Sequence, residues 1–326
     1  MALAIGIPVV SNTSPATATE TPWLIWVGLS VACMNIVLLA KAGWGESRAR
    51  TKAARSNSRK NVKRCVKWPA IHLGLSGVIV YCFQACLCPS GTLELTLFFI
   101  HGAGETPAVW RLQTLHFKDS VAVELPGHPT GSGLTSIQAY AEFVRDQIGH
   151  HEWRDVILVG HSMGGAIAIE LALSNQVLQG LILIGTGARL RVHPELLSEL
   201  RENYEKAAKH IASWSVSPSA DPVIIDRFTE SVLQLSPQVT LADYLACDKF
   251  DRMNDLDKVT CPTLVVCGED DKMTPPKYSR YIHEKIRSSR LEIIPGAGHS
   301  VMLEKHREFN RAIENFVVSL SASAQV

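Results

Sequence analysis

A serine flanked by glycines stands directly after an apolar run. Residues 160–164 read Gly-His-Ser-Met-Gly, the run before them is 156–159, and small residues in a helical pattern follow. A strand, a serine between glycines and a helix make a nucleophile elbow, because so sharp a turn leaves no room for large flanking side chains. Ser162 is therefore the predicted nucleophile. The other interpretation is that Ser162 only caps the helix after it, so the motif needs support from elsewhere in the chain.

Two later apolar runs lead into the residues that a serine nucleophile needs. The run 263–267 is followed by Asp270 and Asp271, and the run 291–295 is followed by His299. A serine hydroxyl is a poor nucleophile at neutral pH, so a histidine must take its proton while a carboxylate fixes the histidine tautomer. The chain order nucleophile, acid, histidine excludes the chymotrypsin and subtilisin arrangements.

An earlier apolar run, 95–100, has the character of a buried strand in a parallel sheet, and it leads into His-Gly-Ala-Gly at 101–104. The negative oxygen that forms when a serine attacks a carbonyl needs hydrogen-bond donors placed in advance. The small residues 102–104 would let the backbone of this loop approach such an oxygen. A plain turn at the end of a strand is the alternative interpretation.

With these motifs in this order, the chain resembles the α/β-hydrolase superfamily from about residue 90 to its end. The resemblance implies an α/β fold with a mostly parallel sheet flanked by helices and a helical lid insertion. It implies that Asp271 is the acid, because relatives place it at the fourth position counted from the glycine that ends the strand; Asp270 remains the alternative. It also implies that the backbone N–H groups of Met163 and Ala103 form the oxyanion hole.

Residues from about 187 to 258 fit helical patterning better than strands. In proteins that the chain resembles, an insertion here forms a lid over the nucleophile, which selects substrate by excluding water and shaping the pocket. We expect Trp214 and Phe228 from this lid, and Trp110 near the His-Gly loop, to line the substrate pocket.

The N-terminal part differs in charge from the rest of the chain. The net charge is +1, yet residues 1–89 contain ten Lys or Arg and two Glu, which leaves a net charge of −7 for the remainder. Residues 23–40 carry no charge, and at about 1.5 Å per residue they just span a hydrocarbon core of about 30 Å. We expect an extension over 1–67 with a membrane span at 23–40, and a hydrolase domain over 68–326. The basic run from Lys41 would place that domain in the cytoplasm. A soluble cytoplasmic enzyme with an unstructured extension is the alternative.

A second apolar stretch, 70–87, has two interpretations. Its segment 77–83 is rich in β-branched and aromatic residues, which favours an early strand of the sheet. A second membrane span would instead place the hydrolase on the opposite side of the membrane. We expect the strand, because the fold requires one before the His-Gly loop.

Other chemistry finds little support in the sequence. The eight cysteines contain no Cys-x-x-Cys pair, which argues against a zinc ribbon and against a disulfide scaffold. The glycines of 127–133 lack the strand and helix of a dinucleotide site. The basic stretch 41–67 contains one aromatic residue, Trp44, so solvation or lipid contact is favoured over nucleic-acid binding. We predict no metal, no cofactor and no nucleic-acid partner, and the oligomeric state stays open.

Three functions follow from these residues. The first is hydrolysis of a carboxylic ester in a small-molecule acyl substrate, through an acyl-enzyme on Ser162. The second is carbon–carbon cleavage or elimination on a keto acid with the same triad, for which lid arginines such as Arg189 or Arg191 would bind the carboxylate. The third is a non-catalytic binding protein, whose usual sign is a lost triad member. All three members are present, so the sequence predicts a serine esterase.

Overall fold

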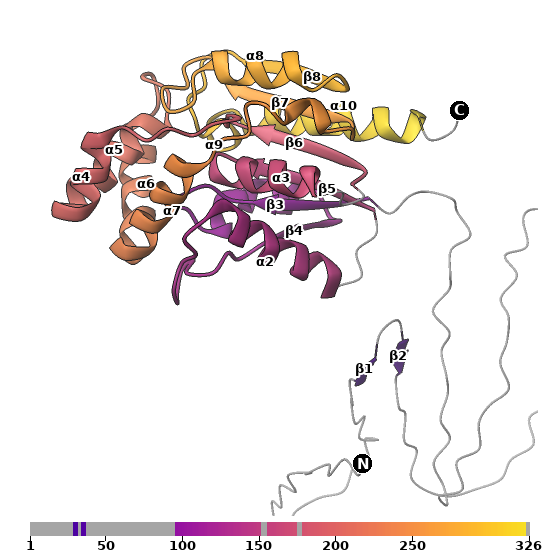
Figure 1. Cartoon of the computed structure of the whole chain (residues 1–326), viewed down its shortest axis with the longest axis horizontal. Helices are drawn as coiled ribbons and strands as arrows, with labels where there is room; N and C mark the ends of the chain where they lie inside the picture. The colour runs from indigo at the N-terminus through magenta and orange to yellow at the C-terminus, as the bar shows by residue number, and fades with distance from the viewer. Residues whose placement is uncertain (1–28, 32–33, 37–94, 151–154, 175–177, 324–326) are drawn as a thin grey trace, which may run out of the picture. The chain divides into compact units, whose positions relative to one another are not determined.

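The computed structural model describes residues 29–31, 34–36, 95–150, 155–174 and 178–323. The chain divides into two compact units, residues 1–91 and 92–326. In the first unit the described residues form two short antiparallel strands, β1 (Leu29–Val31) and β2 (Met34–Ile36). The second unit has the layered arrangement of helices and sheet that Figure 1 shows.

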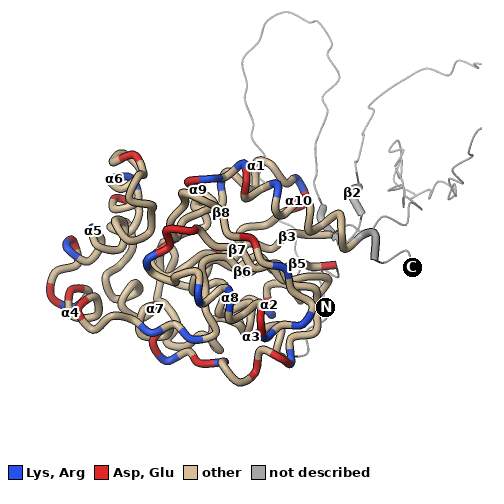
Figure 2. The backbone as a smooth tube through the Cα atoms, turned by 90° about the horizontal axis from the view of Figure 1, so that it is seen from above, with Lys and Arg blue, Asp and Glu red and all other residues tan. Residues whose placement is uncertain are grey.

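A parallel sheet forms the centre of the second unit, with the described strands in the order β4-β3-β5-β6-β7-β8. The strands are β3 (Thr96–Ile100), β4 (Ser120–Ala122), β5 (Val156–His161), β6 (Gly180–Ile184), β7 (Thr263–Gly268) and β8 (Ser289–Ile294). Each neighbouring pair is parallel. The inner strands β3, β5, β6 and β7 are nearly all apolar and buried, without a charged residue, and their tube is tan in Figure 2. This is the pattern of a parallel sheet that helices cover on both faces.

Helices cover both faces of the sheet. Alternate residues of a strand point to opposite sides, so both faces of these apolar strands need to be covered. Phe98 and Leu158 pack with one apolar cluster, and Phe99 and Val159 pack with the other. The first face carries α2 (Ile137–His150), α3 (Met163–Leu173) and α8 (Pro276–Lys285). The second carries η1 (Pro107–Trp110), α1 (Arg111–His116), α9 (Val301–Glu304) and α10 (His306–Ser323). The predicted α/β-hydrolase architecture is confirmed.

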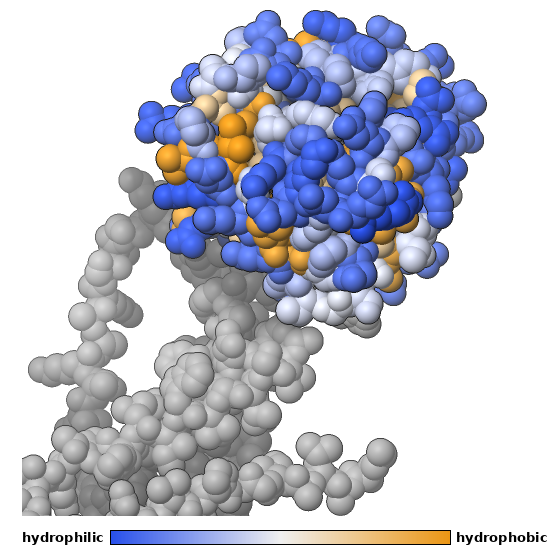
Figure 3. Space-filling model, turned by 90° about the vertical axis from the view of Figure 1, so that its left-hand side faces the viewer, coloured by the Kyte–Doolittle hydropathy of each residue, from blue (hydrophilic) through white to orange (hydrophobic). Residues whose placement is uncertain are grey.

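Four consecutive helices lie between β6 and β7 and gather at one end of the sheet in Figure 1. They are α4 (Pro194–Glu202), α5 (Tyr204–Ser215), α6 (Pro222–Leu233) and α7 (Pro237–Lys249), and the short η2 (Leu256–Lys258) leads on to β7. Three of them begin with proline, whose fixed φ suits a first helical turn. They share an apolar cluster of their own. Their outer surface is mostly hydrophilic with separate apolar areas, as Figure 3 shows.

The helical membrane span predicted over 23–40 is not found in the six residues described there. These residues form the strands β1 and β2 and are not helical. Within the described ranges, no helix is long and apolar enough to cross a membrane. The other residues of 23–40, and the whole of 70–87, lie outside the described residues. Membrane attachment and the early strand therefore stay predictions.

Candidate active site

Ser162 occupies the sharp turn between β5 and α3. Its φ of 51° and ψ of −114° make it the one non-glycine residue with positive φ in the described part of the chain, a conformation that costs energy for an L-residue. Neighbouring glycines make the turn possible. A Cβ at Gly160 would meet the carbonyl of Gly164, and a Cβ at Gly164 would meet the carbonyl of Ile100. The Ser162 N–H donates to Ile184 O at 2.9 Å, which anchors the turn to the next strand.

His299 follows β8 and lies against Asp271, which follows β7. His299 Nδ1 is 2.8 Å from Asp271 Oδ2. The carboxylate also accepts the N–H groups of Met273 and Thr274, at 2.9 and 2.8 Å, and the Thr274 hydroxyl at 2.9 Å. Asp270 instead accepts the hydroxyl of Ser217 at 3.2 Å. Of the two aspartates that the sequence offers, Asp271 is thus the one that holds the histidine ring.

The charges of this pair support each other. Burial alone would raise the pKa of Asp271, but His299 and the hydrogen bonds from Thr274 bring it below its ordinary value. Burial alone would lower the pKa of His299, but the Asp271 carboxylate raises it above its ordinary value. The aspartate is therefore ionised at neutral pH, and the imidazole is a stronger base than a free histidine.

Ser162 and His299 line the same small cavity, together with Gly102 and Ala103 of the loop after β3. Its volume is about 10 Å³, room for about one water molecule. A larger cavity of about 280 Å³ lies between that loop and α6. Both cavities are lined by Glu105 and Phe228, so these two side chains separate the inner cavity from the outer one.

The remaining predicted residues fall into two groups. Ala103 lines the inner cavity, and Met163 is the first residue of α3, where a backbone N–H has no partner within the helix. Phe228 lines both cavities as expected. The two tryptophans do not line either cavity. Trp110 is fully buried among core side chains, and Trp214 stacks on the ring of His210.

The pocket prediction for Trp110 is wrong for a physical reason. Trp110 follows the His-Gly loop in the chain, yet its ring centre lies 4.9 Å from that of Phe99 and 6.4 Å from that of Phe309, in the apolar layer under the sheet. A large ring beside a loop can turn toward a pocket or toward the core. Sequence position does not decide between them, whereas the apolar area buried does.

A carboxylate that the sequence reasoning overlooked lies beside the inner cavity. Glu105 Oε2 accepts the Gly102 N–H at 2.6 Å and lies 3.0 Å from Nδ1 of His161. The other ring nitrogen of His161, Nε2, lies 3.1 Å from the His299 carbonyl oxygen. An acidic residue directly behind a His-Gly loop was the available signal. An acidic residue at such a position can lie in a solvated turn or can be buried, and only the tertiary structure distinguishes the two cases.

A second overlooked carboxylate comes from the helices above the sheet. Asp243 of α7 is fully buried and accepts from Tyr140 OH at 2.7 Å and from the Gly104 N–H at 3.1 Å. Its Oδ2 lies 2.8 Å from His128 Nε2. Next to this pair, burial and the charge of His128 lower the pKa of His101 to about 4. An aspartate in mid-helix usually faces water, so no local pattern indicated this contact.

Chemically, the arrangement offers a serine on a strained turn, a histidine held by a carboxylate, and backbone N–H groups in the loop after β3 and at the start of α3. The described residues include no group of three or more His, Cys, Asp or Glu side chains that could hold a metal ion.

Comparisons with known proteins agree with this geometry. Residues 97–312 match the model of the Alpha/beta hydrolase family. The chain is 28% identical over 250 residues to the pimeloyl-[acyl-carrier protein] methyl ester esterase of Neisseria meningitidis, covering 68% of this chain and 76% of that protein. It is 25% identical to Protein ABHD8 of Mus musculus, over 95% of this chain and 72% of that protein.

Among solved structures, a thermophilic esterase is 36% identical to this chain, with a TM-score of 0.62 over 69% of this chain and 90% of that one. The family model covers more than half of the sequence, and the parallel sheet, the serine elbow and the Asp271–His299 pair stand in the same region. The chain is a member of the Alpha/beta hydrolase family.

Proposed function

We propose that this enzyme hydrolyses carboxylic esters of small-molecule acyl substrates through Ser162, His299 and Asp271. His299 takes the proton of the Ser162 hydroxyl as its oxygen attacks the ester carbonyl, and then gives it to the leaving alcohol. Water, activated by the same histidine, releases the acid from the acyl-enzyme. The N–H groups of Ala103 and Met163 stabilise the negative oxygen of each tetrahedral intermediate.

The observation that carries the proposal is the meeting of three separate segments at one cavity. The strained serine and the histidine line it together, and the histidine is held at 2.8 Å by a buried carboxylate. A serine nucleophile of this kind works with a histidine, a carboxylate and an oxyanion hole. The names of the matched esterases support the same reaction type.

The outer cavity is mainly apolar, and its charged side chains are Glu105 and Arg227. The outer cavity is lined by Val109, Ile224 and Leu303 among others, and the inner one by Ile211 and Met273. We propose that helices α4 to α7 form the lid, and that an apolar chain of the substrate lies in the outer cavity. Phe228 has to move aside when the ester reaches Ser162, because the inner cavity holds only about 10 Å³.

The keto-acid alternative has weaker support. It required a lid arginine, such as Arg189 or Arg191, to face the pocket. Arg189 instead pairs with Asp251 at 3.7 Å, Arg191 donates to the Asp248 carbonyl, and neither lines a cavity. Arg227 of α6 lines the outer cavity, but the Glu105 carboxylate lines both cavities and would repel a substrate carboxylate near the reacting carbon.

The test is a hydrolysis screen with acyl esters of graded chain length, with keto acids beside them and with Ser162→Ala as the variant. We expect activity on esters and a loss of at least about 10³-fold in Ser162→Ala. Ser174→Ala, at the other end of α3, is the matched control and should keep full activity. A fluorophosphonate probe should label the wild type and not Ser162→Ala. Wild-type rates in a folded Ser162→Ala protein would disprove the proposal.

A further inference from the structure

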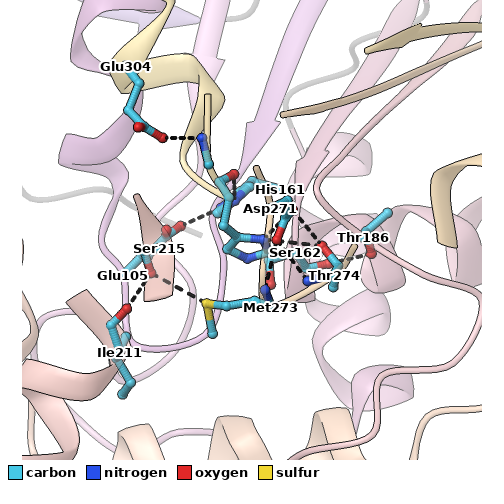
Figure 4. A network of polar contacts seen from close by, with 12 residues as sticks. Glu105, His161, Ser162, Thr186, Ile211, Ser215, Asp271, Met273, Thr274 and Glu304 are labelled. Atoms are coloured by element: carbon cyan, nitrogen blue, oxygen red, sulfur yellow. Dashed lines mark hydrogen bonds and ion pairs between the residues drawn. The ribbon is translucent and has the colours of Figure 1, made fainter. Parts of the chain in front are cut away.

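The residue directly before Ser162 belongs to a buried network that the proposed reaction does not use. His161 is the last residue of β5, and only 1% of its surface is exposed. Its two ring nitrogens lie 3.0 Å from Glu105 Oε2 and 3.1 Å from the carbonyl oxygen of His299. The ring also lies 4.7 Å from the ring of His299, centre to centre. Figure 4 shows Glu105 and His161 beside Ser162.

Both partners of the His161 ring are oxygen atoms that accept hydrogen bonds. A backbone carbonyl oxygen can only accept a hydrogen bond, and so can a carboxylate. A neutral imidazole has one donor nitrogen and would leave the other lone pair facing an oxygen. With both nitrogens protonated the ring is a cation, and Glu105 supplies the opposite charge that a buried cation requires. His161 also lowers the pKa of the Glu105 carboxyl, against the effect of burial.

We propose that Glu105 and His161 form an ion pair that positions the oxyanion loop and His299 around Ser162 and balances the charge next to His299. This inference rests on the proposed function, because it concerns the same site. It assigns no new catalytic residue, since neither group is proposed to touch the reacting atoms.

Each member of the pair fixes a different part of the site. Glu105 holds the Gly102 N–H at 2.6 Å, and the next N–H along the loop is that of Ala103, the proposed oxyanion donor. His161 holds the carbonyl of His299 and thereby the backbone of the general base. The absence of a side chain at Gly102 leaves room for the pair. A Cβ there would lie 2.9 Å from Glu105 Oε2 and 3.1 Å from His161 Nδ1, closer than side chains normally pack.

The pair also affects the charge that His299 acquires during turnover. The charged groups around His299 are Asp271 after β7, Glu105 after β3, Glu304 on α9 and His161 on β5. The titratable groups around Glu105 are His161, His101 and Tyr244, and Arg227 of α6 lines the outer cavity with it. The carboxylate of Glu105 favours protonated His299, whereas a cationic His161 disfavours it. Because the two charges have opposite signs, removal of either one should shift the titration of His299, and the two shifts should have opposite signs.

The test measures kcat, KM and their pH dependence for Glu105→Gln, His161→Gln and the double variant of the full chain. We expect kcat to fall in each single variant, by less than the roughly 10²- to 10³-fold that loss of an oxyanion donor costs, with KM little changed. The acid limb of kcat/KM should move to lower pH in Glu105→Gln and to higher pH in His161→Gln. It should return toward the wild-type position in the double variant. His116→Gln, which removes an exposed histidine from its 2.7 Å contact with Glu314, is the control and should leave all values unchanged.

A second measurement does not depend on activity. With ¹⁵N-labelled histidine, the ring signals that disappear in His161→Gln belong to His161. In the wild type both of its ring nitrogens should carry protons at neutral pH, and in Glu105→Gln one of them should lose its proton. A neutral His161 in the wild type, or acid limbs that move in the same direction in both single variants, would overturn the inference. Loss of activity in Ser162→Ala would still support the proposed function in that case, so the two failures are distinguishable.

Discussion

Removal of the Asp243 carboxylate should destabilise the enzyme strongly. Asp243 joins α7 to the layer beneath it through His128, Tyr140 and the Gly104 N–H, and it is fully buried. Nδ1 of His128 lies 3.0 Å from the Pro126 carbonyl oxygen, so both of its ring nitrogens face acceptors and the ring is a cation. The Asp243→Leu substitution leaves this buried cation and two further donors without their partner.

The magnitude follows from the cost of breaking a buried ion pair on one side, about 3–5 kcal/mol. A domain of this size loses roughly 2–4 °C in Tm per kcal/mol, which gives a decrease of about 6–20 °C. Asp243→Asn should cost less, since an amide keeps the shape and can hydrogen-bond to a neutral His128. Thermal unfolding followed by circular dichroism measures both variants. Asp146→Asn, on the exposed side of α2, is the control and should change stability by less than about 0.5 kcal/mol.

The pH dependence of the same variants gives a second check. Burial alone would lower the pKa of His128, but the hydrogen bond and charge of Asp243 raise it above the ordinary value of 6.5. The stability that a raised histidine pKa contributes is fully present below the pKa of the unfolded state. It is lost as the pH rises through the pKa of the folded state. The difference in Tm between wild type and Asp243→Asn should therefore shrink as pH rises above 6.5. A Tm of Asp243→Leu within about 2 °C of wild type would refute the buried ion pair.

Three further predictions concern the proposed chemistry and the N-terminal segment. Asp271→Asn should lower kcat by roughly 10⁴-fold, because the amide favours the wrong tautomer of His299, whereas Asp270→Asn should have a small effect; the reverse ranking in steady-state kinetics would move the acid by one residue. The raised pKa of His299 predicts that kcat/KM falls as pH decreases through a value above 6.5, because the base must be neutral to accept a proton; a pH profile that stays flat through this range would contradict it. Full-length protein should sediment with membranes and resist carbonate extraction if residues 23–40 anchor it, and recovery entirely in the supernatant would exclude the anchor.

The sequence by itself determined the elements and their order. Apolar runs without charges identified the inner strands, because a strand buried on both faces has to be apolar along its length. Gly160 and Gly164 marked the elbow, because a Cβ at either position would meet backbone atoms. These signals are local. Each depends on residues that are neighbours in the chain, so a reading of the sequence alone can find them.

Tertiary structure decided the contacts that join distant segments. The sequence offered Asp270 and Asp271 without a physical reason to choose, and the fold brings Asp271 to His299 while Asp270 turns to Ser217. Asp243 meets Gly104 from 139 positions away. Burial converts such a residue from a solvated charge into the partner of a buried cation. Which polar side chains are buried depends on how helices and sheet pack against one another, and no pattern along the chain records that packing.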